Sequence, residues 1–328
     1  MLSLGLAEIL VRCFLEVPTV GIIPLSRFRL SSNPLIAYEP VPLYGDGGKL
    51  EPDFSLRGGF NEQSNTLGFR DRDHSLQKPD GAKRILIIGD SISVGWAVPN
   101  YADTYVPQLE QLLLDAGNKV ELVNFSVAGY NTGQEVELLK ERGLAFHPDM
   151  VILQYCVNDS YDPWPANMHF AQTLLRRQQA AGLEFMNLGR YLNLSALYRI
   201  VKFRLLPVLL PAGSDQPYSY LAKDTVRASL QTLKAVADAQ KFPVVIVFFP
   251  TAPQGKPGRS ASEAGKLKRW AEDLKFSYID LSSQLAVCAA DSGVVQFLDE
   301  FHPSISGHSC AARALAPAVA EILGSDRH

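Results

Sequence analysis

Runs of apolar residues alternate with stretches of helical periodicity in the middle of the chain. Residues 85–88, 120–124 and 150–155 are short apolar runs, each of which predicts a buried strand. Between them, apolar residues recur at helical spacing over 104–116 and 134–145. Strands that alternate with helices pair in parallel through right-handed crossovers. The pattern therefore predicts an α/β fold with a doubly wound sheet.

Predicted strands and a predicted helix also occur towards the C-terminus. Residues 243–249 predict another buried strand, residues 277–280 a shorter one, and residues 306–323 a closing helix. We assign residues 84–328 to one main domain, interrupted by a segment at 160–219 that breaks the alternation.

The segment at 160–219 directly follows the carboxyl end of a predicted strand, which is where ligands bind in open α/β sheets. Its position predicts a lid or substrate insertion over an active site. A helix expected at 194–205 has one apolar and one basic face. For this helix alone, packing on the core is favoured over a lid, and a basic face on a membrane surface is the weaker alternative.

The N-terminal part, residues 1–83, has a different character. Residues 17–83 are interrupted by many prolines and glycines, which predicts an extended arm with short strands that wraps the main domain. The apolar residues 1–15 contain Glu8 and Arg12, which argue against a membrane span. Two interpretations stay open: an amphipathic helix in peripheral contact with a membrane, or the end of an anchor that begins upstream.

Composition narrows the function classes. The chain has 328 residues, 47% of them hydrophobic, and a formal net charge of -3, so it can bury a full core. It has no basic run, which argues against nucleic acid as a partner and favours a small or neutral substrate. The four widely spaced cysteines do not predict a disulfide framework or a zinc site, and we expect Cys156 and Cys310 to be buried free thiols.

A candidate nucleophile follows the first predicted strand, in the sequence Gly89-Asp90-Ser91. Taken alone, this tripeptide is also ordinary turn and helix-start chemistry, and we expect Asp90 to hold the turn. A serine hydroxyl is a weak nucleophile that needs a base and donors for an oxyanion. The interpretation of Ser91 as a nucleophile therefore depends on the rest of the chain.

Suitable partners occur at three other places. Gly129, after the second strand, permits close approach of the backbone to a ligand, and the Asn158 amide, after the third, is a candidate donor to an oxyanion. Near the C-terminus, Asp299 precedes His302 by three residues, a spacing that lets a carboxylate orient an imidazole base.

These four blocks, in this order, resemble the SGNH hydrolases, the GDSL esterase/lipase family. The resemblance covers residues 85–159 and 297–311 and implies a flavodoxin-like, three-layer α/β/α sandwich with a mostly parallel sheet. One position departs from the pattern, because Cys156 replaces the glycine that usually opens the third block.

The resemblance also implies roles for individual residues. Ser91 would be the nucleophile, His302 its base and Asp299 the residue that orients His302. The N–H of Ser91, Gly129 and the Asn158 amide would form the oxyanion hole. No metal or organic cofactor is implied.

We therefore expect a serine esterase that hydrolyses acyl or acetyl esters, with an acylated carbohydrate or lipid among the substrates considered. An acyltransferase with the same triad is the main alternative. A non-catalytic glycan- or lipid-binding protein is less favoured, because no member of the triad is missing. Similar proteins with an N-terminal arm are often exported or anchored, which favours an extracytoplasmic or membrane-associated location.

Several other residues are candidates for a role in or near the site. Trp96, Trp164 and Tyr130 are candidates to line a substrate pocket, although core packing is equally expected for Trp96. For His308 we expect a helix-start or buried polar role, and for His169 an exposed loop position.

Overall fold

The computed structural model describes most of the main domain and parts of the N-terminal region. The described residues are 28–33, 35–36, 38–42, 64–160, 225–253 and 259–325, with isolated positions in 5–10 and 195–201. The chain divides into two compact units, one of residues 1–41, 53–57 and 163–222, the other of residues 42–52, 58–162 and 223–328. The helix expected at 194–205 and nearly all of the predicted insertion lie outside the described residues.

The first unit contains a short antiparallel pair, β1 (Phe28–Leu30) with β2 (Tyr38–Pro40), so the N-terminal region does contain short strands. The Glu8 carboxylate accepts hydrogen bonds from Ser195 Oγ at 2.8 Å and from the Leu197 N–H at 3.0 Å. The N-terminal segment and the segment after residue 160 therefore contact each other. That the arm wraps the main domain stays a prediction.

The second unit is built on a five-stranded parallel sheet with strand order β4-β3-β5-β6-β7. In chain order, counted from β3, this is the 2-1-3-4-5 order of the flavodoxin-like fold. The predicted doubly wound sheet is confirmed. The strands are β3 (Lys83–Ile88), β4 (Val120–Asn124), β5 (Met150–Tyr155), β6 (Val244–Phe248) and β7 (Ser277–Asp280).

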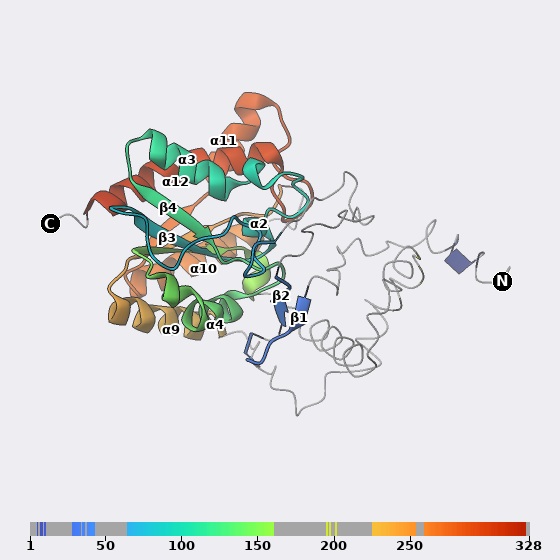
Figure 1. Ribbon diagram of the computed structural model, residues 1–328. Helices are drawn as coiled ribbons and strands as arrows, with labels where there is room; N and C mark the ends of the chain where they lie inside the picture. The colour runs from blue at the N-terminus through green and yellow to red at the C-terminus, as the bar shows by residue number, and fades with distance from the viewer. Residues whose placement is uncertain are drawn as a thin grey trace. The chain divides into compact units, whose positions relative to one another are not determined.

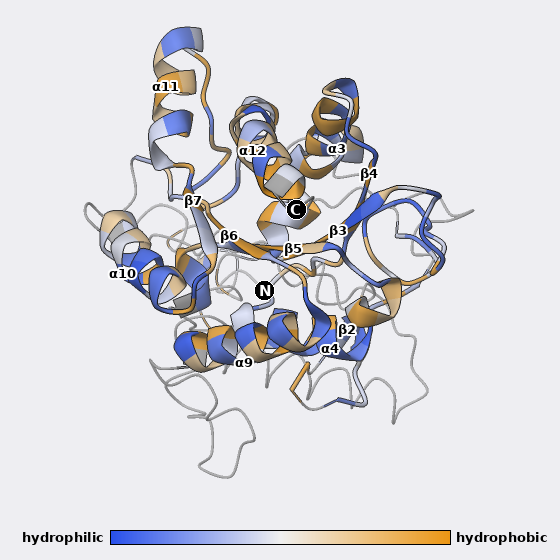
Figure 2. Ribbon diagram, turned by 90° about the vertical axis from the view of Figure 1, so that its left-hand side faces the viewer, coloured by the Kyte–Doolittle hydropathy of each residue, from blue (hydrophilic) through white to orange (hydrophobic). Residues whose placement is uncertain are grey.

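Helices cover both faces of this sheet, as the apolar character of its strands requires. Figure 2 shows α3, α11 and α12 on one face and α4, α9 and α10 on the other, and α4 and α9 run side by side (Figure 1). The three-layer arrangement is therefore confirmed. The helices are α3 (Tyr105–Asp115), α4 (Thr132–Glu141), α9 (Thr225–Gln240), α10 (Arg259–Asp273), α11 (Ser282–Ser292) and α12 (Ile305–Ser325).

One helix is shorter than predicted. The helix expected over 134–145 ends at Glu141, and a 3₁₀ turn over Gly143–Phe146 follows it. At Gly143 a Cβ atom would lie 2.7 Å from Leu86 Cδ2, so a larger residue would have to displace the Leu86 side chain. Glycine is also a poor helix former, which agrees with the early end.

The cysteines differ from expectation. Cys288 on α11 and Cys310 on α12 form a disulfide with a Cα–Cα distance of 6.3 Å, so the prediction that Cys310 is a free thiol is wrong. The two residues are 22 positions apart, and only the packing of α11 on α12 brings them together. Cys156 is free and buried, as predicted.

A buried arginine connects the residues that precede β3 to the amino end of the parallel sheet. Arg84, at the start of β3, is fully buried, and its guanidinium donates to Glu121 Oε2 at 2.7 Å and to the carbonyl oxygens of Ser75 and Leu76 at 2.8 and 3.0 Å. His74 contacts the same Glu121 carboxylate at 2.8 Å. Burial lowers the pKa of His74, but its carboxylate partners outweigh this and raise it.

Among the described residues, no helix has both the length and the apolar character needed to cross a membrane.

We predict that Arg84→Met destabilises the domain by about 3–5 kcal/mol, because Glu121 loses a buried charged partner and the carbonyl oxygens of Ser75 and Leu76 lose their donor. Urea unfolding followed by circular dichroism measures this change. Lys268→Met is the control, because Lys268 forms an exposed pair with Glu272 at 3.9 Å, and its effect should stay below about 1 kcal/mol. Equal effects of the two substitutions would contradict the structural role of Arg84.

Candidate active site

The turn after β3 is held in place by a side chain from the neighbouring strand β5. Gln154 Oε1 accepts hydrogen bonds from the Asp90 N–H at 3.1 Å and from Ser93 Oγ at 2.9 Å. A Cβ atom on Gly89 would lie 2.5 Å from the same oxygen, so a larger residue there would displace the Gln154 side chain. Sequence reasoning missed Gln154, because a single polar residue within an apolar strand carries no distinctive signal.

Asp90 and Ser91 begin the short helix α2 (Ser91–Val94). Asp90 is its N-cap, and its Oδ1 accepts a hydrogen bond from the Ile92 N–H at 2.9 Å. The expectation that Asp90 holds the turn is therefore confirmed. Cap bonding of this kind fixes the start of a helix, and here it fixes the backbone at Ser91.

The structure brings the predicted nucleophile, base and orienting residue together. His302 Nε2 lies 2.9 Å from Ser91 Oγ, and His302 Nδ1 lies 2.7 Å from Asp299 Oδ2. Ser91 is half-buried, and 16% of the His302 side chain is exposed. A hydroxyl, an imidazole and a carboxylate are thus connected by two hydrogen bonds in a row, although Ser91 and His302 are 211 positions apart.

The loop that carries Asp299 and His302 has its own hydrogen bonds. The Leu298 N–H donates to the His302 carbonyl oxygen at 2.8 Å, and Phe297 and Pro303 form an isolated antiparallel bridge. The Ala252 N–H, in the segment after β6, donates to the Glu300 carbonyl oxygen at 2.8 Å. The loop is therefore closed on itself and tied to the carboxyl end of the sheet.

The Asp299 carboxylate is held in its ionised form. Its partial burial by itself raises the pKa, but hydrogen bonds from the His302 ring and from the N–H groups of His302 and Phe301 outweigh this and lower the pKa to about 2. The two N–H groups both donate to Oδ1, each at 2.8 Å. An ionised carboxylate at Nδ1 fixes the imidazole tautomer and stabilises a protonated ring.

Candidate oxyanion donors lie on the loops after β3, β4 and β5. Gly129 has φ +81°, a left-handed conformation that favours glycine, and it is partly exposed. Within the described part of the chain, no acceptor is bound to the N–H of Ser91 or Gly129. Asn158 Nδ2 donates one hydrogen to Asp90 Oδ2 at 2.7 Å, and an amide nitrogen carries two.

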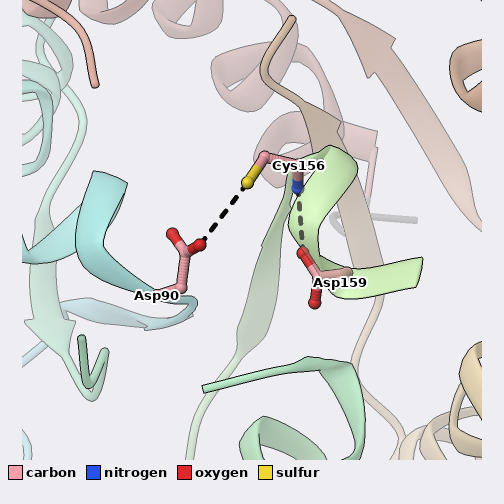
Figure 3. Close-up of side chains that lie close together, drawn as sticks. All are labelled: Asp90, Cys156 and Asp159. Atoms are coloured by element: carbon pink, nitrogen blue, oxygen red, sulfur yellow. Dashed lines mark hydrogen bonds between the residues drawn. The ribbon is translucent and has the colours of Figure 1, made fainter. Parts of the chain in front are cut away.

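A cluster of buried side chains lies behind these donors. Figure 3 shows the Cys156 thiol directed at the Asp90 carboxyl group, at 3.4 Å, and the Cys156 N–H donating to Asp159 Oδ2 at 2.9 Å. Burial and the nearby Asp90 raise the pKa of Asp159 well above its usual range. Burial and the charges of Asp159 and Asp90 also raise the pKa of Glu135 on α4 well above its usual range.

Asp90, Cys156 and Asp159 also have the spacing of metal ligands. One ligand atom from each lies within 4.8 Å of the others, and all three residues are buried. Their oxygens already accept hydrogen bonds from Ile92, Asn158, Cys156 and Thr132. A metal ion here would have to displace the bonds that fix Ser91 and Asn158.

The candidate pocket residues are placed differently from one another. Trp96 is 6% exposed and its ring centroid lies 6.2 Å from that of His302, while Tyr130 is buried at 2% exposure. Trp164 and His169 lie outside the described residues. Sequence reasoning missed Arg70, which donates to the carbonyl oxygens of Val94, Gly95 and Val98 and so fixes the segment that carries Trp96.

His308 has the buried polar role that was expected. It is fully buried on α12, and its Nδ1 accepts a hydrogen bond from the Tyr105 N–H at 3.3 Å. Burial, with the charges of Arg70 and His302, lowers the pKa of His308 to about 3. The ring is therefore neutral at physiological pH and joins α12 to α3.

We predict that Asp299→Asn lowers the melting temperature at neutral pH and that this difference shrinks in acid. The folded pKa of Asp299 is about 2, below its ordinary value of 3.8. The stabilisation it provides is therefore complete above about pH 4 and is lost as the pH falls towards 2. Melting curves of both proteins between pH 2 and 7 measure the difference. A difference that grows in acid would contradict the assignment.

Comparison with known proteins identifies one family. The family profile described as "GDSL-like Lipase/Acylhydrolase family" matches residues 87–310. A curated arylesterase from Vibrio mimicus is 29% identical over 84 residues, which is 26% of this chain and 42% of that protein. The chain thus covers less than half the length of this relative.

Two solved esterase structures each align with 74% of this chain. The psychrotrophic esterase EstA from Pseudoalteromonas sp. is 14% identical, with 74% of this chain and 99% of that chain covered and a TM-score of 0.47. A catalytic mutant of Axe2, an acetylxylan esterase from Geobacillus stearothermophilus, is 17% identical, with 74% and 95% covered and a TM-score of 0.46.

Proposed function

Because the chain belongs to the GDSL-like lipase/acylhydrolase family, we propose that it is a serine esterase that hydrolyses acyl or acetyl esters. The observation that carries the proposal is the unbroken path of hydrogen bonds from Asp299 through His302 to Ser91. A hydroxyl within reach of an oriented imidazole is what nucleophilic catalysis by serine requires.

In the proposed first step, Ser91 Oγ attacks the ester carbonyl carbon while His302 Nε2 accepts its proton. The ionised Asp299 stabilises the imidazolium that forms. The oxyanion of the tetrahedral intermediate accepts hydrogen bonds from the N–H groups of Ser91 and Gly129 and from Asn158 Nδ2. When the intermediate collapses, His302 gives the proton to the leaving alcohol oxygen.

The second step returns the enzyme to its starting state. Water attacks the acyl-Ser91 carbonyl carbon while His302 accepts a proton from it. The same donors bind the second oxyanion, and His302 then returns the proton to Ser91 Oγ as the carboxylic acid leaves. Both half-reactions balance with water as the only co-substrate.

Apolar side chains beside the loop support a substrate with an acyl chain. Val294, Val295 and Leu298 are 51%, 70% and 51% exposed, and Leu298 directly precedes Asp299. Exposed apolar side chains on the segment that leads into the Asp299–His302 loop can contact an apolar group of a substrate. We therefore propose an ester of a carbohydrate or lipid whose acyl part contacts this surface.

The disulfide supports the proposed location. Disulfides persist mainly in oxidising compartments, and the Cys288–Cys310 bond agrees with an extracytoplasmic protein. Peripheral membrane association through the N-terminal segment stays a prediction.

We predict hydrolysis of p-nitrophenyl esters by the wild-type chain, tested across acyl lengths from acetate to palmitate. Ser91→Ala and His302→Ala should each lower kcat by about 10⁴-fold or more, as loss of a nucleophile or base does in serine hydrolases. Ser282→Ala, which removes an exposed hydroxyl on α11, is the matched control and should keep wild-type turnover.

The acyl length with the highest kcat/KM separates an acetylesterase from a lipase. Transfer to an added alcohol or sugar that exceeds hydrolysis would replace esterase by acyltransferase. Folded protein with no turnover on any of these esters and no transfer would contradict the proposal.

A further inference from the structure

Cys156 stands where the resembling family usually has a glycine, and its side chain has two specific neighbours. It is 2% exposed, at the carboxyl end of β5. Its thiol donates to Asn158 Oδ1 and lies 3.4 Å from Asp90 Oδ2. A glycine at this position would provide neither contact. The question is what the thiol does for the amide that we propose as an oxyanion donor.

An asparagine amide can lie in two orientations that differ by exchange of its oxygen and nitrogen. A neighbour that faces the NH₂ donor in one orientation therefore faces the oxygen acceptor in the other. Here Nδ2 faces Asp90 Oδ2 at 2.7 Å, and Oδ1 faces the Cys156 thiol. In the reversed orientation two oxygens would face each other at Asp90, and the thiol would meet an N–H donor. Both neighbours therefore favour the same orientation.

We propose that Cys156 is a positioning residue, whose thiol holds the Asn158 amide so that Nδ2 keeps one hydrogen for a substrate oxyanion. This inference rests on the proposed esterase function. Asp90 fixes the nitrogen end of the amide and Cys156 fixes its oxygen end. Asp90 also caps the helix that begins with Ser91, so the nucleophile and the amide donor share one support.

The thiol is suited to this task because it stays protonated. Burial and the nearby Asp90 and Asp159 raise the pKa of Cys156 well above its usual range. A protonated thiol has one hydrogen to donate. Asp90 Oδ2 already accepts a hydrogen bond from Asn158 Nδ2 at 2.7 Å, so we assign the thiol hydrogen to Asn158 Oδ1.

A double-mutant cycle between Cys156 and Asn158 tests the proposal. Loss of an oxyanion donor lowers kcat by about 10²–10³-fold, so we expect this from Asn158→Ala. Cys156→Ala should lower kcat by about tenfold with KM within about twofold, because only the orientation of the donor is lost. In the Asn158→Ala background, Cys156→Ala should change kcat by less than about twofold.

Two further variants separate positioning from general damage to the core. Cys156→Ser keeps a donor and should recover kcat to within about threefold of wild type. Tyr278→Phe removes a hydroxyl that donates to the Ala264 carbonyl oxygen at 3.1 Å, outside the Asp90, Cys156 and Asn158 contacts, and its effect should add to that of Asn158→Ala. If Cys156→Ala does not fold, Cys156→Val takes its place in the cycle.

The proposal is overturned if Cys156→Ala costs the same factor with and without Asn158, or if Cys156→Ser is as slow as Cys156→Ala. A wild-type chain without esterase activity would contradict the proposed function instead. In that case the infrared S–H stretching band of Cys156 tests the contact with Asn158. The band is recorded in a Cys13→Ala background, so that the Cys13 thiol does not contribute to it. The band should move in Asn158→Ala, and an unmoved band would refute the contact.

Discussion

The geometry of the site depends on the hydrogen bonds of the buried Asp90 carboxyl group. It has no exposed surface, and a polar group in that position must be hydrogen-bonded to be tolerated. Its two oxygens are used by the Ile92 N–H and by Asn158 Nδ2. One side chain thus connects the turn after β3, which presents Ser91, to the turn after β5, which presents Asn158.

The parallel sheet explains why residues so distant in sequence meet. In a doubly wound sheet the carboxyl ends of all strands lie along one edge. Ser91, Gly129 and Asn158 follow three adjacent strands, β3, β4 and β5, and the loop with Asp299 and His302 is tied to the end of β6. At this edge His302 Nε2 lies 2.9 Å from Ser91 Oγ, and His302 Nδ1 lies 2.7 Å from Asp299 Oδ2.

Sequence reasoning succeeds here where a local pattern is sufficient. The apolar runs of β3, β5 and β6 and the shorter, partly apolar stretches of β4 and β7 predict all five strands, and Ser91, Asp299 and His302 stand in short local motifs. Sequence reasoning fails where a property depends on contacts between elements that are distant in the sequence. The Cys288–Cys310 bond depends on the crossing of two helices, and Arg84 is buried because five nearby carbonyl and carboxylate groups can accept its hydrogens. Neither property is visible in residue spacing.

The helices α9, α10 and α11 were also not predicted. α9 follows a segment without clear periodicity, and α10 carries many charged and small residues that weaken its apolar stripe. α9 and α10 connect β5 to β6 and β6 to β7, and their position follows from the crossover that a parallel strand pair needs, whereas α11 follows the last strand. The fold was therefore predictable as a class, while the individual covering helices were not.

The central claim is that Ser91 is an activated nucleophile, and its reaction with a fluorophosphonate tests this most directly. Intact-mass measurement followed by peptide mapping should find one adduct, on Ser91, which disappears in Ser91→Ala and forms much more slowly in His302→Ala. A folded wild-type protein that forms no adduct, or that carries it on another residue, would contradict the account.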